Sequence, residues 1–401
     1  MRVLQLYSAL TNDEQRLIFE DFGTTRKVIL STNIAETAIT INGIVYVVDC
    51  GFVKIRHYNA KKGVENLVVL PVSLSSAKQR AGRAGRNQLG KCYRLYTKNT
   101  MDELDEFNIP EILRCNLDEI VLFLSEYCPY NIQSFPFLDA PESSHIAKSL
   151  EMLKTMGALD PSGTITELGR DIIDFPLEPS YAYCLLNSME LSHQSMLDVI
   201  TIVAITSGEN LYTVNKSLTA NNNPRNKFKN SSSDHLSKLH LFYAYIETKN
   251  KKKFCEHFGV RKRALDNIIL VREQLVNIVK AKKAAKEQLS QSNSLIPKDK
   301  HKVYTNKLNM NDANKNEIIS KIDVHFTFDK PAIISCLRKS FFNKIAELDS
   351  DGFYRIKDTY EKAKLHPESV LFMARSRPKK VVFNTLITTT KTYINDVSEI
   401  Q

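Results

Sequence analysis

The sequence predicts a multidomain protein, α/β at its start, helical in its middle and closed by a small β-barrel. Three observations carry this prediction. The runs at 27–31 and 43–49 are short, β-branched and almost continuously apolar, as strands of a buried parallel sheet are. From residue 110 the apolar period changes to that of helices. Beyond residue 350, apolar and polar residues alternate, as in strands with one buried face.

The bulk composition is that of a globular chain with a basic surplus. Its 401 residues exceed what one compact core usually organises, so we expect roughly two to four domains. The sequence has no apolar run of about 18 residues and no signal peptide, so we expect a soluble chain in the nucleus or cytoplasm, with the nucleus favoured and no membrane partner. The net charge of +10 favours a nucleic acid as partner, the alternative being a basic surface without one.

The seven cysteines are scattered and odd in number. Even the nearest two, Cys115 and Cys128, are too far apart for a C-x-x-C motif. The sequence therefore predicts neither a disulfide framework nor a metal site, and we expect buried thiols.

The first hundred residues predict a small α/β domain. Residues 11–22 have an Asn/Asp start followed by apolar residues at helical spacing. Residues 52–71 alternate around an Asn-x-x-x-Gly turn, which predicts a β-hairpin. The run at 91–97 predicts a further strand.

The rest of the chain predicts helices and then a barrel. A helix beginning at Pro110, a second helix, a short strand and a helix capped by Thr166 together indicate a winged-helix fold. Residues 178–290 predict helices interrupted by a polar loop at 219–234. The Lys- and Asn-rich residues 280–317 predict a linker. A helix at "IISCLRKSFF" and strands at "GFYRIK", "SVLFMA" and "KVVFNTLITTTKTYI" complete the prediction.

The stretch "QRAGRAGR" at 79–86 carries three arginines, Arg80, Arg83 and Arg86. If Ser75 or Ser76 caps a helix here, the arginines share one side of it. Glycines at 82 and 85 would each cost about 1 kcal/mol inside a helix, so we expect another group to approach the backbone closely. No acidic residue lies between Glu65 and Asp102, which predicts an uncompensated positive field. Arginine forks bind phosphate oxygens, although three arginines alone favour a solvated basic face or a nucleic-acid patch.

A second motif decides between these interpretations. "STNIAET" at 31–37 directly follows a predicted buried strand, where α/β sheets bind ligands. Taken in this order, the two segments closely resemble motifs V and VI of the DEAH-box RNA helicases of superfamily 2, and segments such as "GALDPSGTITELGRDIIDFPLEP" agree.

The resemblance implies a multidomain α/β plus α architecture. It implies a second RecA-like domain at 1–99, a winged helix at 100–176, a helical ratchet bundle at 177–300, a linker at 301–319 and an OB-like barrel at 320–401.

The resemblance also implies nucleotide-site roles. Arg83 and Arg86 would be arginine fingers on the γ-phosphate, and Gln79 would orient the attacking water. Phe19 would stack on the nucleotide base, the alternative being a core phenylalanine. Thr40 and Asn42 would face the nucleotide, and Asn42 stands where the family usually has Asp, so a charged contact is lost.

For RNA the resemblance implies a second set of residues. Thr32 and Asn33 would bind RNA phosphates. Ser207 would contact the RNA backbone, the alternative being a helix C-cap. Ala38 replaces a serine that many members use to sense the nucleotide state, which puts that step in doubt. The hairpin at 52–71 would part the strands, or only pack domains together.

Two motifs of such an enzyme are missing: the sequence has no G-x-x-x-x-G-K-[ST] phosphate loop and no Asp-Glu-Ala-His box. We expect ATP (or another NTP) and Mg²⁺ to require a separate first RecA-like domain, so that this chain alone is inactive. We expect the chain to be the C-terminal part of a longer enzyme, the alternative being a genuine half-length protein. The expected partners are RNA and an activating protein that binds at the winged-helix and OB regions. We expect the chain to be monomeric or part of a ribonucleoprotein. The alternative is a non-catalytic RNA- or partner-binding module; action on DNA stays open.

Overall fold

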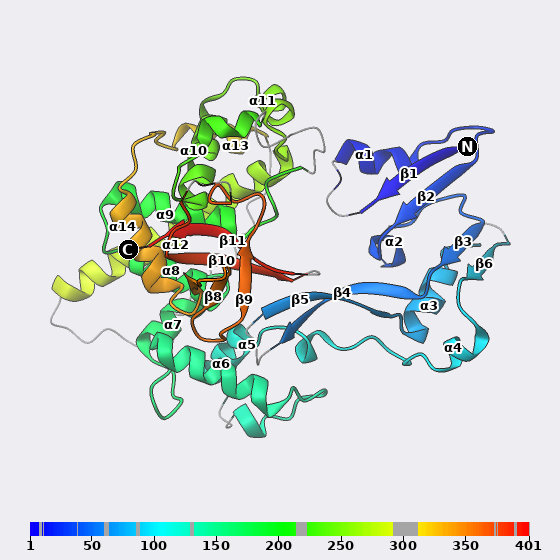
Figure 1. Cartoon of the computed structure of the whole chain (residues 1–401), viewed down its shortest axis with the longest axis horizontal. Coiled ribbons are helices and arrows are strands. Elements are labelled where there is room, and N and C mark those ends of the chain that lie inside the picture. The colour runs from blue at the N-terminus through cyan, green and yellow to red at the C-terminus, as the bar shows by residue number, and fades with distance from the viewer. Residues whose placement is uncertain are drawn as a thin grey trace. The chain divides into compact units, whose positions relative to one another are not determined.

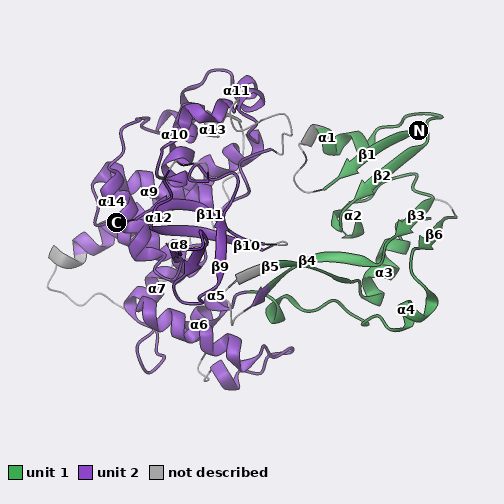
Figure 2. Ribbon diagram, in the orientation of Figure 1, with its two compact units in different colours: residues 1–57, 66–115 green, residues 58–65, 116–401 purple. Residues whose placement is uncertain are grey.

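The computed structural model describes most of the chain (Figure 1). The described residues are 1–7, 10, 12–37, 39–59, 64–85, 89–128, 132–213, 223–291, 312–372, 374, 376–388 and 391–400. Figure 2 shows two compact units, the first made of residues 1–57 and 66–115 and the second of residues 58–65 and 116–401. Within the described part of the chain, every helix is too short or too polar to cross a bilayer.

The first unit is built from short strands and helices. In chain order these are β1 (Arg2–Leu6), α1 (Asn12–Arg16), the 3-10 helix η1 (Leu17–Phe19), β2 (Lys27–Ser31), α2 (Ile34–Thr37), β3 (Tyr46–Asp49), β4 (Phe52–Asn59), β5 (Val64–Pro71), α3 (Leu74–Ala81), β6 (Lys91–Arg94), α4 (Lys98–Asp102) and η2 (Glu111–Leu113). The predicted strands at 27–31 and 91–97, and the predicted hairpin, are present as β2, β6 and β4–β5.

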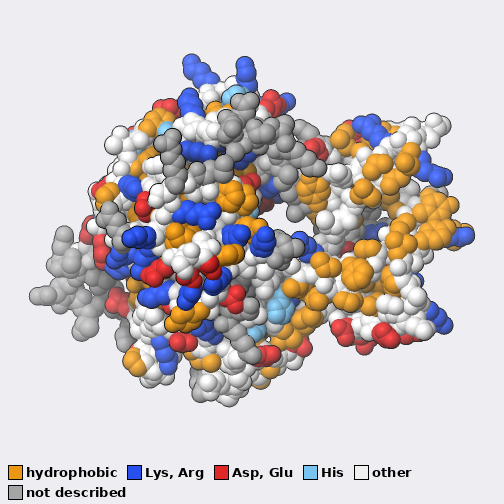
Figure 3. Space-filling model, viewed as in Figure 1, with side chains coloured by type: hydrophobic (Ala, Val, Ile, Leu, Met, Phe, Trp, Pro, Cys, Tyr) orange, Lys and Arg blue, Asp and Glu red, His pale blue; other side chains and the backbone are white. Residues whose placement is uncertain are grey.

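Four strands of this unit form two parallel pairs, as predicted. β1 runs beside β2, from Arg2 opposite Lys27 to Leu6 opposite Ser31, and β3 runs beside β6. The prediction that these strands are buried on both faces is wrong. Leu30 on β2 is 59% exposed and Val48 on β3 is 66% exposed, and Figure 3 shows hydrophobic side chains gathered on this unit.

The second unit begins with helices that fit the predicted winged helix. These are α5 (Asp118–Tyr127), α6 (Ser143–Met156) and α7 (Glu167–Ile173), with the 3-10 helix η3 (Ile132–Ser134) between the first two. A single β-bridge joins Leu159 to Ile165, and the hydroxyl of Thr166 accepts the amide of Gly169 at 3.1 Å, so the predicted cap is present. The helix predicted from Pro110 is only the short η2 there, and α5 begins at Asp118.

Further helices follow, as the apolar period predicts. They are α8 (Pro179–Ser188), α9 (His193–Thr206), the 3-10 helix η5 (Pro224–Phe228), α10 (Asp234–Glu247), α11 (Lys251–Phe258), α12 (Lys262–Gln291), α13 (Asp312–Ser320) and α14 (Lys330–Ser340). The prediction of a linker at 280–317 is wrong at both ends, which belong to α12 and α13. The buried Lys282 explains the longer helix, because its ammonium pairs with Asp171 and Asp174, each at 2.7 Å.

Five strands at the end of the chain close into a barrel. They are β7 (Ile345–Leu348), β8 (Tyr354–Ile356), β9 (Lys362–Leu365), β10 (Lys380–Thr388) and β11 (Thr392–Glu399). They pair in the order β11-β9-β8-β7-β10, and a β10–β11 pairing completes the ring. Tyr354, Val381 and Ile394 fill the interior. The predicted strand "SVLFMA" is wrong, because its described residues 369–372 form a turn.

The cysteines are all free thiols. Only Cys184, Cys255 and Cys336 are buried, whereas Cys50 is exposed and the others are half-buried, so the prediction of buried thiols holds for three of them.

Candidate functional site

The arginine-rich segment begins on a capped helix and ends in a turn. The hydroxyl of Ser73 accepts the amide of Ser76 at 3.1 Å, so Ser73 is the N-cap of α3 and the prediction of Ser75 or Ser76 is wrong. The helix ends at Ala81 with Gly82 as its C-cap, and Gly85 has a φ of 83°, a conformation that favours glycine. The two glycines therefore stop the helix and form the turn after it, rather than lying in a helix interior.

Arg80 is committed to pairing within the unit. Its Nε donates to Glu36 at 3.0 Å and its Nη1 donates to Asp49 at 2.8 Å. The same Nη1 donates to the carbonyl of Phe52 at 3.2 Å, and the hydroxyl of Ser76 donates to the other oxygen of Glu36 at 2.5 Å. The predicted uncompensated field is therefore wrong at this arginine, since its counter-charges come from α2 and β3. Arg80 joins α2, β3, β4 and α3.

Asp49 at the end of β3 is the centre of this network. Its carboxylate also accepts the amide of Gly51 at 3.0 Å and the hydroxyl of Tyr96 at 3.1 Å. Burial would raise the pKa of Asp49, but the Gly51 amide, Arg80 and Tyr96 outweigh it and hold the pKa below its ordinary value. A side chain at Gly51 would meet the Tyr96 ring at 2.7 Å, so the glycine leaves room for this ring. Asp49 thus links β3 to Arg80 on α3, the helix that precedes the turn at 82–85.

Arg83 differs from Arg80 in how it is held. Its Nη1 donates to the carbonyl of Ile39 at 3.3 Å, which places the guanidinium against the loop that follows α2. Its Nε is buried and, like the Nε atoms of Arg94, Arg225 and Arg261, has no acceptor among the described residues. A buried donor without an acceptor costs free energy. The Arg83 Nε is therefore suited to donate a hydrogen bond to an anionic oxygen of a ligand.

The other two predicted catalytic residues are only partly placed. Gln79 lies on α3, one residue before the half-buried Arg80, and its side chain is exposed. Arg86 lies outside the described residues, so its role stays a prediction.

Phe19 ends η1 and is 55% exposed. Its neighbour Ile18 is fully buried in a cluster with Leu4 and Leu6, and Ile39 packs against the same cluster. The core-phenylalanine alternative is therefore wrong. Because the Ile39 carbonyl also accepts Arg83, one cluster anchors both the exposed aromatic residue and the arginine.

The loop residues predicted to contact nucleotide or RNA are on the surface. Thr32 and Asn33 are exposed at the start of α2, and Thr32 is tied to β1 by its amide, which donates to the carbonyl of Leu6 at 3.1 Å. Thr40 and Asn42 are exposed on the segment that leads to β3. Ala38 lies outside the described residues. All of these roles stay predictions.

Ser207 belongs to the second unit and is the C-cap of α9. Its hydroxyl donates to the carbonyl of Val203 at 2.7 Å. The C-cap alternative is therefore present in the structure, and an RNA contact by Ser207 stays a prediction.

The residues of the first unit fit one part of a nucleoside triphosphate. Arg83 offers a buried donor to phosphate and Phe19 offers an exposed ring to a base. Among the described residues, no group of three His, Cys, Asp or Glu side chains could hold a metal ion. The described residues of this unit therefore suit the phosphate and the base of a nucleotide, but they do not suit Mg²⁺.

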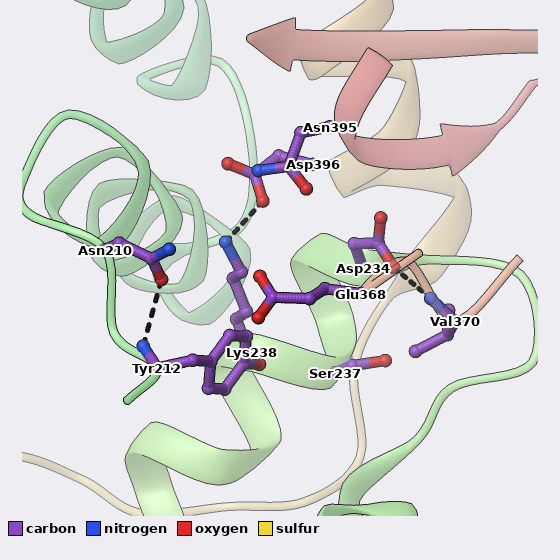
Figure 4. A pocket seen from close by; sticks show the side chains of 9 residues that line it. All are labelled: Asn210, Tyr212, Asp234, Ser237, Lys238, Glu368, Val370, Asn395 and Asp396. Atoms are coloured by element: carbon purple, nitrogen blue, oxygen red, sulfur yellow. Dashed lines mark hydrogen bonds and ion pairs between the residues drawn. The ribbon is translucent and has the colours of Figure 1, made fainter. Parts of the chain in front are cut away.

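A polar pocket in the second unit is a second candidate for a ligand site (Figure 4). There Lys238 pairs with Asp396, and Asp234 accepts the amides of Val370 and Val397 at 2.7 and 2.8 Å. Its free volume is about 30 Å³, roughly that of one water molecule. We interpret it as the joint between α10 and the barrel rather than as a ligand site.

Three family matches agree with this architecture. Residues 1–88 match the helicase conserved C-terminal domain, residues 149–177 the winged-helix helicase-associated domain HA2, and residues 333–401 an oligonucleotide/oligosaccharide-binding (OB) fold. The matches follow one another along the chain and define the C-terminal region of a helicase.

Curated relatives of similar sequence are RNA helicases. The chain is 35% identical over its whole length to the probable ATP-dependent RNA helicase DHX35 of Homo sapiens, covering 52% of that protein. It is 34% identical to the ATP-dependent RNA helicase DHX33 of Mus musculus, with 99% of this chain and 52% of that protein covered. The family matches and these relatives together support a C-terminal portion of a DEAH-box RNA helicase. It spans about half the length of the curated relatives it matches.

Proposed function

We propose that this chain is the C-terminal part of an ATP-dependent RNA helicase that supplies the arginine side of the ATP site. The observation that carries the proposal is Arg83, whose buried Nε has no acceptor among the described residues. Three residues away, Arg80 is paired with two carboxylates. In this proposal Arg80 stabilises the fold and Arg83 binds the ligand. An arginine aimed at a transferring phosphoryl group stabilises the charge that develops on it.

The phosphate loop and the Mg²⁺ site would come from a separate first RecA-like domain. When bound, Mg²⁺ would neutralise the charge of the phosphates there. Exposed apolar side chains on the first unit support the packing of further polypeptide on it; they include Val3, Leu30, Tyr46, Val48, Tyr93 and Leu95. An apolar surface of this kind is typical of an interface.

The work of the complete enzyme would be translocation on single-stranded RNA and remodelling of RNA or ribonucleoprotein. The net charge of +10 supports contact with the phosphate backbone. The OB-fold match at 333–401 supports a second place where a single strand binds. The names of the relatives support RNA rather than DNA.

Two measurements test the proposal. The complete protein should hydrolyse ATP in an RNA-stimulated manner, whereas the 401-residue chain alone should bind RNA with an affinity that falls steeply with salt and show no ATPase. If the complete protein binds RNA but has no RNA-stimulated ATPase, the rival function, a non-catalytic RNA-binding module, is supported instead. That rival draws on the same net charge and on the absence of a phosphate loop from the sequence.

A further inference from the structure

A cavity of about 190 Å³ lies in the second unit between the start of α9, the middle of α12 and residues 321–323. One water molecule occupies roughly 30 Å³ in the liquid, so this volume accepts a ligand of several heavy atoms. It is too small for a polymer strand.

The cavity wall contains a buried arginine that lacks a carboxylate partner. Arg272 on α12 is 4% exposed, and its Nε donates to the hydroxyl of Thr201 at 2.8 Å. No described carboxylate comes within ion-pair distance of its guanidinium. The buried Asp198 is nearby but accepts the hydroxyl of Tyr243 at 2.7 Å and interacts with His325 at 3.1 Å. Burial lowers the pKa of Arg272 and outweighs the opposing effect of the charges on Glu273 and Asp198.

Other positive groups line the same cavity. Lys280 is two helical turns along α12 from Arg272, and Lys321 reaches the cavity from the segment after α13. His193 and Gln194 line it as the first two residues of α9, a helix of 14 residues. The positive end of the α9 dipole is therefore at the wall, which favours an anion there.

Two carboxylates, those of Glu273 and Asp323, also line the cavity. They are fewer than the three cationic side chains, but Lys321 also pairs with Glu317 at 2.8 Å, so Arg272, Lys280 and the helix dipole are the groups that favour an anion. Both a guanidinium fork and ammonium groups suit a tetrahedral oxyanion with several acceptor oxygens.

We propose that this cavity binds a phosphate group, either as inorganic phosphate or as the phosphomonoester of a small molecule. Arg272 contributes the buried fork, Lys280 and Lys321 contribute charge at the mouth, and the start of α9 contributes its dipole. The site belongs to the second unit, whereas Arg83 belongs to the first, so it is an addition to the proposed ATP site.

Titration calorimetry on the 401-residue chain tests this proposal, with inorganic phosphate and glycerol 3-phosphate as probes against chloride of equal ionic strength. Saturable binding of either probe is expected, and the two arms separate the free anion from the ester. Arg272→Gln should weaken binding about tenfold or more through loss of the charged fork. Lys280→Gln, an exposed change that keeps the fold, should weaken it about threefold. The control Arg263→Gln, exposed on the same helix outside the cavity, should leave it unchanged.

Hydrogen exchange locates the bound phosphate. Protection is expected in α9 and α12 on adding phosphate. The proposal is overturned if neither probe binds below about 10 mM, if Lys280→Gln binds like the control, or if protection is confined to the first unit. Displacement of phosphate from this site by a short RNA would assign the site to an RNA backbone and overturn the small-ligand proposal.

Discussion

Arg80→Ala tests the support beneath the proposed ATP site. The substitution leaves two carboxylates without their cation, Asp49 with a side chain 0% exposed and Glu36 with one 9% exposed. Removing one partner of a buried ion pair costs about 3–5 kcal/mol. Because the Arg80 side chain is itself 15% exposed and water can reach it, we expect the lower end, about 3 kcal/mol.

Calorimetry is the assay, since the chain has no tryptophan. For a unit of about a hundred residues, this loss lowers the Tm of the first unit by roughly 15 °C. Lys78→Ala, exposed on the same helix, is the matched control and should cost less than about 0.5 kcal/mol. Asp49→Asn combined with Arg80→Ala should cost less than the sum of the single changes.

The pH dependence of Arg80→Ala follows from Asp49. Its pKa is lowered in the fold, so its contribution is present above the ordinary value of 3.8 and is lost as the pH falls through the lowered pKa. The difference between wild type and Arg80→Ala should therefore shrink below about pH 4. The reasoning is refuted if Arg80→Ala is no less stable than Lys78→Ala at pH 7.

Three further predictions concern other parts of the chain. Burial raises the pKa of Asp234 to about 6, so the fold favours its protonated form and its contribution to stability falls as the pH rises from about 4 to 6. Between pH 5 and 7 the free energy of unfolding of wild type should therefore drop about 1 kcal/mol more than that of Asp234→Asn, measured by urea unfolding, and equal slopes would contradict this. Phe19→Ala in the complete protein should raise the KM for ATP about tenfold at unchanged kcat, with Phe19→Tyr close to wild type, and an unchanged KM would reject base stacking. Ser73→Ala should lower the stability of the first unit by about 1 kcal/mol through loss of the α3 cap, and no change in Tm would argue against that cap.

Local signals in the sequence predicted local structure well. The Thr166 cap and the strand at 27–31 were predicted correctly, because each is determined by residues close together in the sequence. β7 and β9 were missed because each has only four residues, too few to establish an alternating pattern. The end of α3 was misplaced because the sequence was interpreted as a continuous helix through Gly82.

Long-range partners were the part that the sequence did not predict. Arg80 finds Glu36 and Asp49, which precede it by 44 and 31 residues, so no spacing rule connects them. The available signals were that Asp49 ends a predicted buried strand and that Glu36 lies in the polar segment that follows another. Lys282 likewise lies in a lysine-rich segment typical of a linker, and its pairing with Asp171 and Asp174 is visible only in the fold.

The most direct test of the account is the RNA-stimulated ATPase of the complete protein with Arg83→Ala. An arginine finger contributes about 10³–10⁵-fold to kcat, so we predict a loss of at least about 10³-fold. Lys78→Ala serves as the control on the preceding helix, and the affinity for RNA should stay within about threefold of wild type. RNA-stimulated turnover retained in Arg83→Ala would contradict the central claim that this chain supplies the arginine side of the ATP site.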